Sequence, residues 1–141
     1  SPDEMNPVPP MAMGHVGWHE LYSGAFDADL DFYTAAFGWT KGEAMDMGEM
    51  GLYQLVSQTG GSDFQSMSGG IMPQPKEMPV PLWLFYFIVG DIDAAVERVT
   101  AGGGTVLNGP MAVPGGGWII QALDPQGAMF ALVGMRAGEE S

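Results

Sequence analysis

The sequence predicts an α+β domain of two βαβββ modules related by a pseudo-twofold axis, with eight strands forming an open cleft. An internal repeat predicts it: shifted by 66 positions, residues 24–40 align without gaps on residues 90–106, with six of the seventeen positions identical. The order of strand-like and helical patterns also agrees between the two copies. Because each half-sheet has one face under its helix and one face uncovered, the two open faces are expected to pack around a shared pocket.

The first copy begins with a β-rich run at residues 18–23, which ends at a glycine. Asp27 is then predicted as the N-cap of a helix whose apolar residues recur at helical spacing. Gly38 is expected to end this helix, because glycine tolerates the left-handed conformation. Short strands are expected at residues 44–47, 52–58 and 64–72.

The second copy repeats this order. A β-rich run at residues 82–89 precedes Asp93, the predicted N-cap, and the glycines at 102–104 are expected to end the helix. Asp124-Pro-Gln-Gly predicts a tight turn between the last two strands, because proline presets one dihedral and glycine accepts a positive φ. Strands are expected at residues 111–113, 118–123 and 128–133.

The length of 141 residues fits one domain. We expect module one at residues 14–72, a stiff linker at 73–81 and module two at 82–134. The Pro-rich residues 1–13 are predicted to be a flexible arm, and residues 135–141 an acidic tail. Most of the twelve methionines are expected to be core filler.

The composition narrows the classes of partner. Seventeen acidic residues against four Lys and Arg give a net charge of −13, which repels nucleic acid and favours cationic ligands. No apolar run reaches the roughly 18 residues of a membrane span, so no membrane partner is expected. The chain contains no cysteine, which excludes disulfides and thiolate chemistry and suits the predicted cytoplasmic location.

Four motifs follow one another along the chain: WHEL…DFYTAAFGW, GGIMPQP, FYFIVGDIDAAVERVTAGGGTVLNGPMAVPGG and ALDPQGAMFALVG. Together they resemble the vicinal-oxygen-chelate superfamily, which includes glyoxalases, bleomycin resistance proteins and dioxygenases. The resemblance runs from about His15 to Gly134 and is closest to the glyoxalase-like or hydroxylase branch without a metal. It implies the fold but no single activity, because the superfamily includes isomerases, lyases, dioxygenases and binding proteins.

The resemblance also implies where a metal would bind, since metal-using members take ligands from the first and last strands of each copy. The corresponding positions hold Trp18, Leu84 and Ala131, and residues 64–72 contain no carboxylate or imidazole. A catalytic divalent ion needs about three protein ligands. We therefore predict neither a metal nor another cofactor.

Alternation along the first strand places Trp18, Glu20 and Tyr22 on one face, which is expected to line the cleft. The other predicted lining residues come from the second copy and from the later strands: Leu84, Tyr86, Gln54, Trp118 and Gln121. Glu20 is the candidate catalytic or anchoring residue, as a general base or as the partner of a ligand ammonium group. Alternatively, Glu20 bonds Tyr86, Tyr53 or a backbone amide and only fixes the two halves.

Three functions follow from these residues. The first is a ligand-binding protein that sequesters or handles a small aromatic or cationic metabolite or antibiotic. The second is a metal-independent enzyme, such as a glyoxalase-like lyase or isomerase or a hydroxylase-type enzyme, with Glu20 as base. The third is an interaction module. Superfamily members often dimerise, which leaves a homodimer, with or without exchange of halves, open for this chain.

Overall fold

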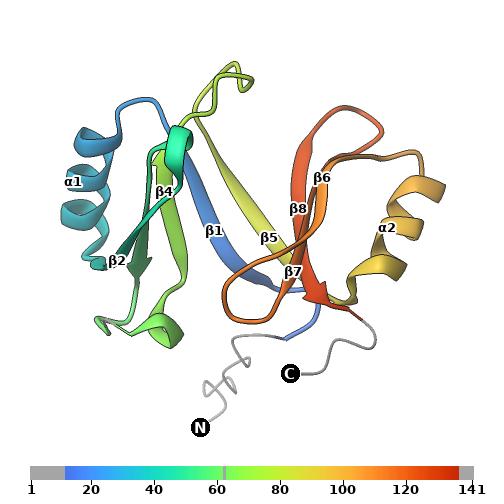
Figure 1. Cartoon of the computed structure of the whole chain (residues 1–141), viewed down its shortest axis with the longest axis horizontal. Coiled ribbons are helices and arrows are strands. Elements are labelled where there is room, and N and C mark those ends of the chain that lie inside the picture. The colour runs from blue at the N-terminus through green and yellow to red at the C-terminus, as the bar shows by residue number, and fades with distance from the viewer. Residues whose placement is uncertain (1–11, 62, 137–141) are drawn as a thin grey trace, which may run out of the picture. The chain divides into compact units, whose positions relative to one another are not determined.

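The computed structural model describes residues 12–61 and 63–136. This part of the chain holds eight strands and two α-helices, in the order strand, helix and three strands, twice over (Figure 1). The α+β class with two βαβββ modules is therefore confirmed. Most of the predicted arm, residues 1–11, and most of the predicted tail, residues 137–141, lie outside the described residues.

The first module has its strands in the order β2-β3-β4-β1, with α1 against one face (Figure 1). β1 and β4 run parallel, and the other neighbouring pairs are antiparallel. Its elements are β1 (Val16–Ser23), α1 (Phe26–Phe37), β2 (Thr40–Asp46), β3 (Leu52–Ser57) and β4 (Gly69–Pro73), with short 3-10 turns at Gly48–Met50 and Phe64–Ser66.

The second module has the equivalent order β5-β8-β7-β6, with a parallel β5–β8 pair and two antiparallel pairs. Its elements are β5 (Leu82–Asp91), α2 (Ile92–Ala101), β6 (Thr105–Ala112), β7 (Trp118–Leu123) and β8 (Met129–Met135). Three pairs of equivalent elements begin 66 residues apart: β1 and β5, α1 and α2, and β3 and β7. The internal repeat therefore corresponds to a repeated structural unit.

The chain forms two compact units whose border does not follow the linker. Among the described residues, one unit is Trp18–Phe85, and the other consists of residues 86–136 together with residues 12–17. In the second unit the chain before β1 pairs with β5, because Gly14 donates its backbone N–H to Ile88 and Ile88 donates to His15, both at 2.8 Å.

Each unit has a core between its helix and its half-sheet. In the first, Leu30 of α1 packs on Leu21, Val56 and Ile71 of three strands. In the second, Ile92 of α2 packs on Ile120 and Ala122. On β5, by contrast, the buried residues Leu84, Tyr86 and Ile88 share the face away from α2 and alternate with the exposed Phe85 and Phe87.

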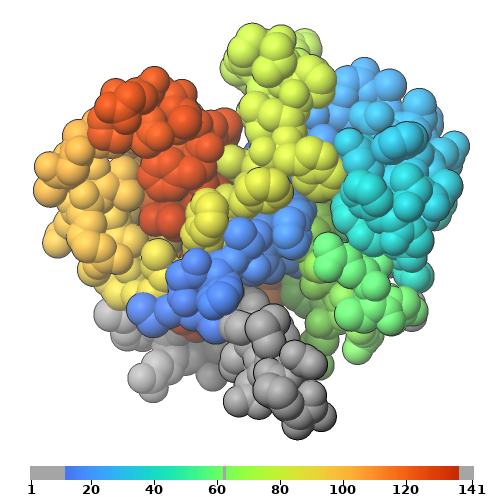
Figure 2. Space-filling view, turned by 180° about the vertical axis from the view of Figure 1, so that it is seen from behind, coloured from blue at the N-terminus to red at the C-terminus, as the bar shows by residue number. Residues whose placement is uncertain are grey.

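Aromatic rings extend the first core to the surface of α1. Tyr33 lies within 6.0 Å, between ring centroids, of Phe32, Phe37, Trp39 and Trp83. Phe32 and Phe37 are 59% and 57% exposed, and α1, coloured light blue to cyan, forms part of the surface in Figure 2. This helix is therefore fixed by ring contacts as well as by its aliphatic core.

The predicted N-caps are wrong by two residues in both helices. α1 begins after Ala25, which makes no side-chain cap, and α2 begins after Asp91, whose carboxylate accepts from the backbone N–H of Ala94 at 2.8 Å. Asp27 and Asp93 lie in the first turns instead, where acidic side chains favour the helix dipole.

The helix ends agree with the sequence. Gly38 caps α1 in the left-handed conformation, with φ of 70°, and α2 ends at Ala101 directly before the glycine run. The strands after the helices begin earlier than expected, since β2 starts at Thr40 and β6 at Thr105. Exposed polar residues and β-bulges interrupt the alternation of apolar and polar side chains in these two strands, so the sequence does not show their full length.

The Asp124-Pro-Gln-Gly turn is confirmed. The Asp124 carboxylate accepts from the backbone N–H groups of Gln126 and Ala128, both at 2.9 Å, and Gly127 has φ of 92°. In the first module, β3 and β4 are joined by a longer segment that contains the Phe64–Ser66 turn. This difference explains why the 66-residue offset does not extend to β4 and β8.

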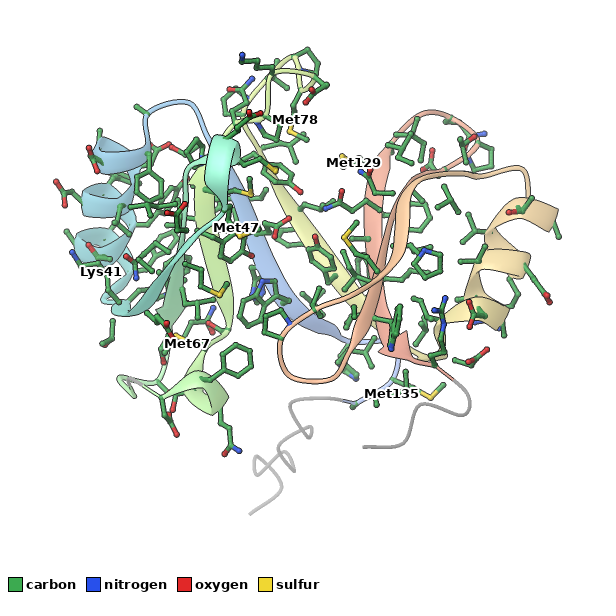
Figure 3. The ribbon with its side chains drawn as sticks, viewed as in Figure 1. Lys41, Met47, Met67, Met78, Met129 and Met135 are labelled. Carbon is green, nitrogen blue, oxygen red and sulfur yellow. The ribbon has the colours of Figure 1, made fainter. Side chains whose placement is uncertain are left out.

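The methionines differ from the expectation. Of those in the described part of the chain, Met67 and Met72 are buried, whereas five are largely exposed: Met13, Met47, Met50, Met111 and Met135. Met47, Met67 and Met135 are labelled in Figure 3. Most of the described methionines are therefore not core filler.

A basic residue fastens the end of β8. Arg136 makes a bidentate ion pair with Asp93, with N–O distances of 2.9 and 3.0 Å. Its guanidinium carbon also lies 4.0 Å from the ring centroid of Trp118.

No helix among the described residues is long and apolar enough to cross a membrane.

The observed cap of α2 can be tested by mutation. Asp91→Ala should lower the free energy of unfolding by about 1 kcal/mol, because the Ala94 N–H loses its acceptor. Asp91→Asn is the control, since asparagine caps about as well as aspartate. Urea unfolding measures both variants, and equal losses in the two would contradict the capping role.

Candidate functional site

One face of the first half-sheet carries the main candidate residues. Leu21, Ile71 and Val56 lie under α1, so alternation places Glu20 and Tyr22 of β1 and Tyr53 of β3 on the opposite face. All three of these residues are buried. The predicted common face of Trp18, Glu20 and Tyr22 agrees with this arrangement.

Glu20 accepts two phenolic hydrogen bonds. Tyr53 donates to Oε1 at 2.6 Å and Tyr22 donates to Oε2 at 2.5 Å. Only 7% of Glu20 is exposed, and a carboxylate removed from water needs such donors to offset its desolvation. The hydrogen bond between Glu20 and Tyr53 that the sequence offered as one alternative is present, and it lies within the first module.

Trp18 sets the direction of this hydrogen-bond chain. Its Nε1 lies 2.9 Å from the Tyr53 hydroxyl oxygen, and an indole N–H can only donate. The Tyr53 oxygen therefore accepts from Trp18, and its own proton points to Glu20. We call Trp18, Tyr53 and Glu20 the relay.

The relay keeps Tyr53 protonated. Burial is the largest cause that raises the pKa of Tyr53 well above its ordinary value of 10, and the negative charge of Glu20 and the hydrogen bond to it raise it further. Tyr53 is therefore a permanent hydrogen-bond donor to Glu20 rather than a base or nucleophile.

The second half-sheet carries a separate polar chain on its face away from α2. Asn108 donates its side-chain amide to Gln121, and Gln121 donates its own to the Tyr86 hydroxyl, both at 2.8 Å. Tyr86 is buried beside Ala131 of β8. Two predicted residues, Tyr86 and Gln121, are thus brought together, and Asn108 joins them.

A comparison with protein families identifies this fold. The family model "Glyoxalase/Bleomycin resistance protein/Dioxygenase superfamily" matches residues 12–132. The chain belongs to this superfamily. The resemblance found in the sequence motifs is therefore confirmed.

Curated relatives share about a third of the aligned residues. The anthracycline biosynthesis protein DauV of Streptomyces sp. (strain C5) is 33% identical over 131 residues, which cover 86% of this chain and 47% of that protein. The putative glyoxylase CFP32 of Mycobacterium bovis is 30% identical over 122 residues, covering 84% and 45%. The chain thus spans about half the length of these relatives.

Solved structures of the superfamily fold are more distant in sequence. Streptomyces coelicolor methylmalonyl-CoA epimerase in complex with 2-nitronate-propionyl-CoA has a TM-score of 0.62 and 18% identity, covering 89% of this chain and all of that one. This likeness concerns the fold alone.

Other predicted residues lie elsewhere in this superfamily domain. Gln54 is the Cα partner of Ile71, hence on the α1 side of β3, and its amide donates to the carbonyls of Gly42 and Leu55 at 2.8 and 3.0 Å. Trp118 packs with Ile92 on the α2 side of β7. Alternation puts Tyr53 and Gln121, rather than Gln54 and Trp118, on the faces away from the helices.

The side chains at the superfamily's metal positions do not fit a divalent ion. Trp18 offers only an N–H donor, Leu84 and Ala131 are buried and apolar, and β4 carries no carboxylate or imidazole. In the described ranges, no three His, Cys, Asp or Glu side chains cluster as ligands. We derive no chemical step through a metal.

The protonated state of Tyr53 makes stability depend on alkaline pH. Because folding raises its pKa, the stabilisation is complete below the unfolded pKa near 10 and declines as the pH rises above it. The wild type should lose about 1.4 kcal/mol per pH unit more than Tyr53→Phe in that range. Denaturant unfolding between pH 8 and 11 tests this, and parallel curves for the two proteins would refute it.

Proposed function

We propose that this domain binds a small cationic molecule with an aromatic part, with Glu20 as the anchoring anion and Trp18 and Tyr22 as stacking surfaces. The observation that carries the proposal is the buried Glu20 carboxylate held by two tyrosine hydroxyls. Such fixed donors orient the carboxylate before a ligand arrives, which lowers the cost of binding.

The chemistry of the carboxylate supports a cationic ligand. Each oxygen of an ionised carboxylate can accept more than one hydrogen bond, so an ammonium group can be added to the two phenols. The net charge of −13 attracts cations to the protein and repels phosphate backbones. A small cation is therefore a better partner than a nucleic acid.

The flanking aromatic side chains support a flat ligand. Trp18 and Tyr22 share the face of Glu20 and are fixed by hydrogen bonds to Tyr53 and Glu20. Rigid aromatic rings offer large contact areas for stacking, and they strengthen the binding of a nearby cation. The site thus combines one anion with two amphipathic rings.

The names of two curated relatives suggest a ligand class. The Streptomyces relatives are anthracycline biosynthesis proteins, and anthracyclines combine a flat aromatic ring system with an amino sugar. Such molecules have both features that the site favours. We therefore propose an anthracycline-like compound as the first ligand to test.

A metal-independent lyase or isomerase with Glu20 as general base is the competing function. Its geometry is less favourable, because each Glu20 oxygen already accepts a short phenolic hydrogen bond. A general base would have to form a covalent O–H bond at an oxygen that already accepts from Tyr22 or Tyr53. An ammonium ligand only adds a hydrogen bond to that oxygen.

The test compares two probes that differ in charge. Doxorubicin carries a charged amine, and its N-acetylated form is neutral but equally aromatic. Glu20→Gln should weaken doxorubicin binding about tenfold or more, the equivalent of about 1.4 kcal/mol, and should change binding of the neutral probe little. Fluorescence titration measures both affinities.

Glu49→Gln is the matched control. It removes the same charge from an exposed 3-10 turn of the same module, outside the relay. Binding of doxorubicin should stay within about twofold of the wild type. Equal affinities of wild type and Glu20→Gln for doxorubicin would refute the proposal, whereas turnover that Glu20→Gln abolishes would favour the enzyme.

A further inference from the structure

We infer that Gly70 is a positioning residue for Glu20: it leaves the space through which the Tyr53 ring crosses β4. This inference deepens the proposed function, because it explains how the anchoring anion is oriented. Gly70 has no side chain of its own and acts on the Glu20 carboxylate through Tyr53.

The strand order makes the crossing necessary. β4 lies between β3 and β1, and neighbouring strands are about 4.8 Å apart. Tyr53 therefore starts about two strand spacings from β1, yet its hydroxyl lies 2.6 Å from Glu20 Oε1. The phenol ring has to pass over the backbone of β4.

Gly70 is the residue under the ring. Gly70 is the Cα partner of Glu20 in β1. In β3 its Cα partner is Leu55, which is two residues from Tyr53 and on the same face of the strand, so the Tyr53 ring reaches Glu20 diagonally over Gly70. A Cβ at this position would lie 1.9 Å from Tyr53 Cε1, 2.3 Å from Cζ and 2.6 Å from the hydroxyl oxygen. Since such contacts are impossible, any other residue here would displace the ring.

Displacement of the ring breaks the relay at its centre. The Tyr53 oxygen accepts from Trp18 and donates to Glu20, so moving it removes both hydrogen bonds at once. Glu20 would keep the hydrogen bond from Tyr22 and lose the one from Tyr53. A single methyl group on β4 would thus alter the carboxylate without changing any residue of the relay.

The second module shows that a glycine is not a general requirement of this strand position. Tyr86 occupies the place in β5 that Glu20 has in β1, and its Cα partner in β8 is Ala131. Ala131 is fully buried, with its Cβ accommodated. There Tyr86 of β5 and Gln121 of β7 meet across β8 with the Ala131 Cβ between them, so the glycine is needed only in the first module, where the Tyr53 ring lies directly over residue 70.

Nuclear magnetic resonance of the tryptophan indole groups tests the inference without a ligand. The chain has four tryptophans, and Trp18→Phe assigns the Trp18 signal. Gly70→Ala and Tyr53→Phe should each move the Trp18 N–H resonance to the position of an indole without a protein acceptor, while the other indole signals stay. An unmoved Trp18 signal in either folded variant overturns the inference.

Two further variants control for folding. Gly24→Ala should change no indole signal, because its added Cβ would meet neighbours only at 3.8 Å or more. Should Gly70→Ala alone not fold, Tyr53→Ala/Gly70→Ala must fold as well as Tyr53→Ala, because the clashing ring is gone. Failure of that paired variant overturns the inference.

Ligand binding then links the inference to the proposed function. In folded Gly70→Ala, doxorubicin binding should weaken about three- to tenfold, the effect of one lost hydrogen bond to the anchor. Tyr53→Phe should give the same loss. A moved Trp18 signal with unchanged binding would refute the anchoring function and leave the positioning role of Gly70 intact.

Discussion

The buried carboxylate of Glu20 is the constraint on which the rest of the first half-sheet's face away from α1 depends. A charge in that position is tolerated only with donors at both oxygens, and the fold supplies them from two strands, β1 and β3. The strand between them must then leave room for the ring to cross, which is why β4 has a glycine at position 70. Residue choice at three positions, Tyr22, Tyr53 and Gly70, thus follows from one charge.

The repeated architecture can be predicted from the sequence because both copies keep the same apolar periodicity and the same order of elements. Apolar periodicity in α1 and β5, and the glycine after α1, located these elements within a few residues. In α2 the sequence does not distinguish the cap Asp91 from Asp93, because two short acids two residues apart give the same signal. In α1 the acids of the first turn suggest a cap, whereas Ala25 stands at that position. Only the backbone geometry selects Asp91 in α2 and none in α1.

The site was predictable only in part for a similar reason. Alternation within β1 is unambiguous, so Glu20 and Tyr22 were placed together. In β3 and β7 the sequence does not show which residues face the helix. A one-residue error in this assignment exchanges Tyr53 with Gln54 and Ile119 with Trp118. Gly70 is the available signal for Tyr53, because a glycine inside a strand often marks a close approach.

The position of the α2 cap at Asp91 has a mechanical consequence for the second module. Asp91 caps the start of the helix, so the Asp93 carboxylate can form the bidentate ion pair with Arg136. The Arg136 guanidinium also stacks on the Trp118 ring. A force applied to the chain just after β8 is therefore carried in part by α2 and β7 before it loads the backbone hydrogen bonds between β5 and β8. Whatever sequence follows Arg136 is joined to a reinforced end of the sheet.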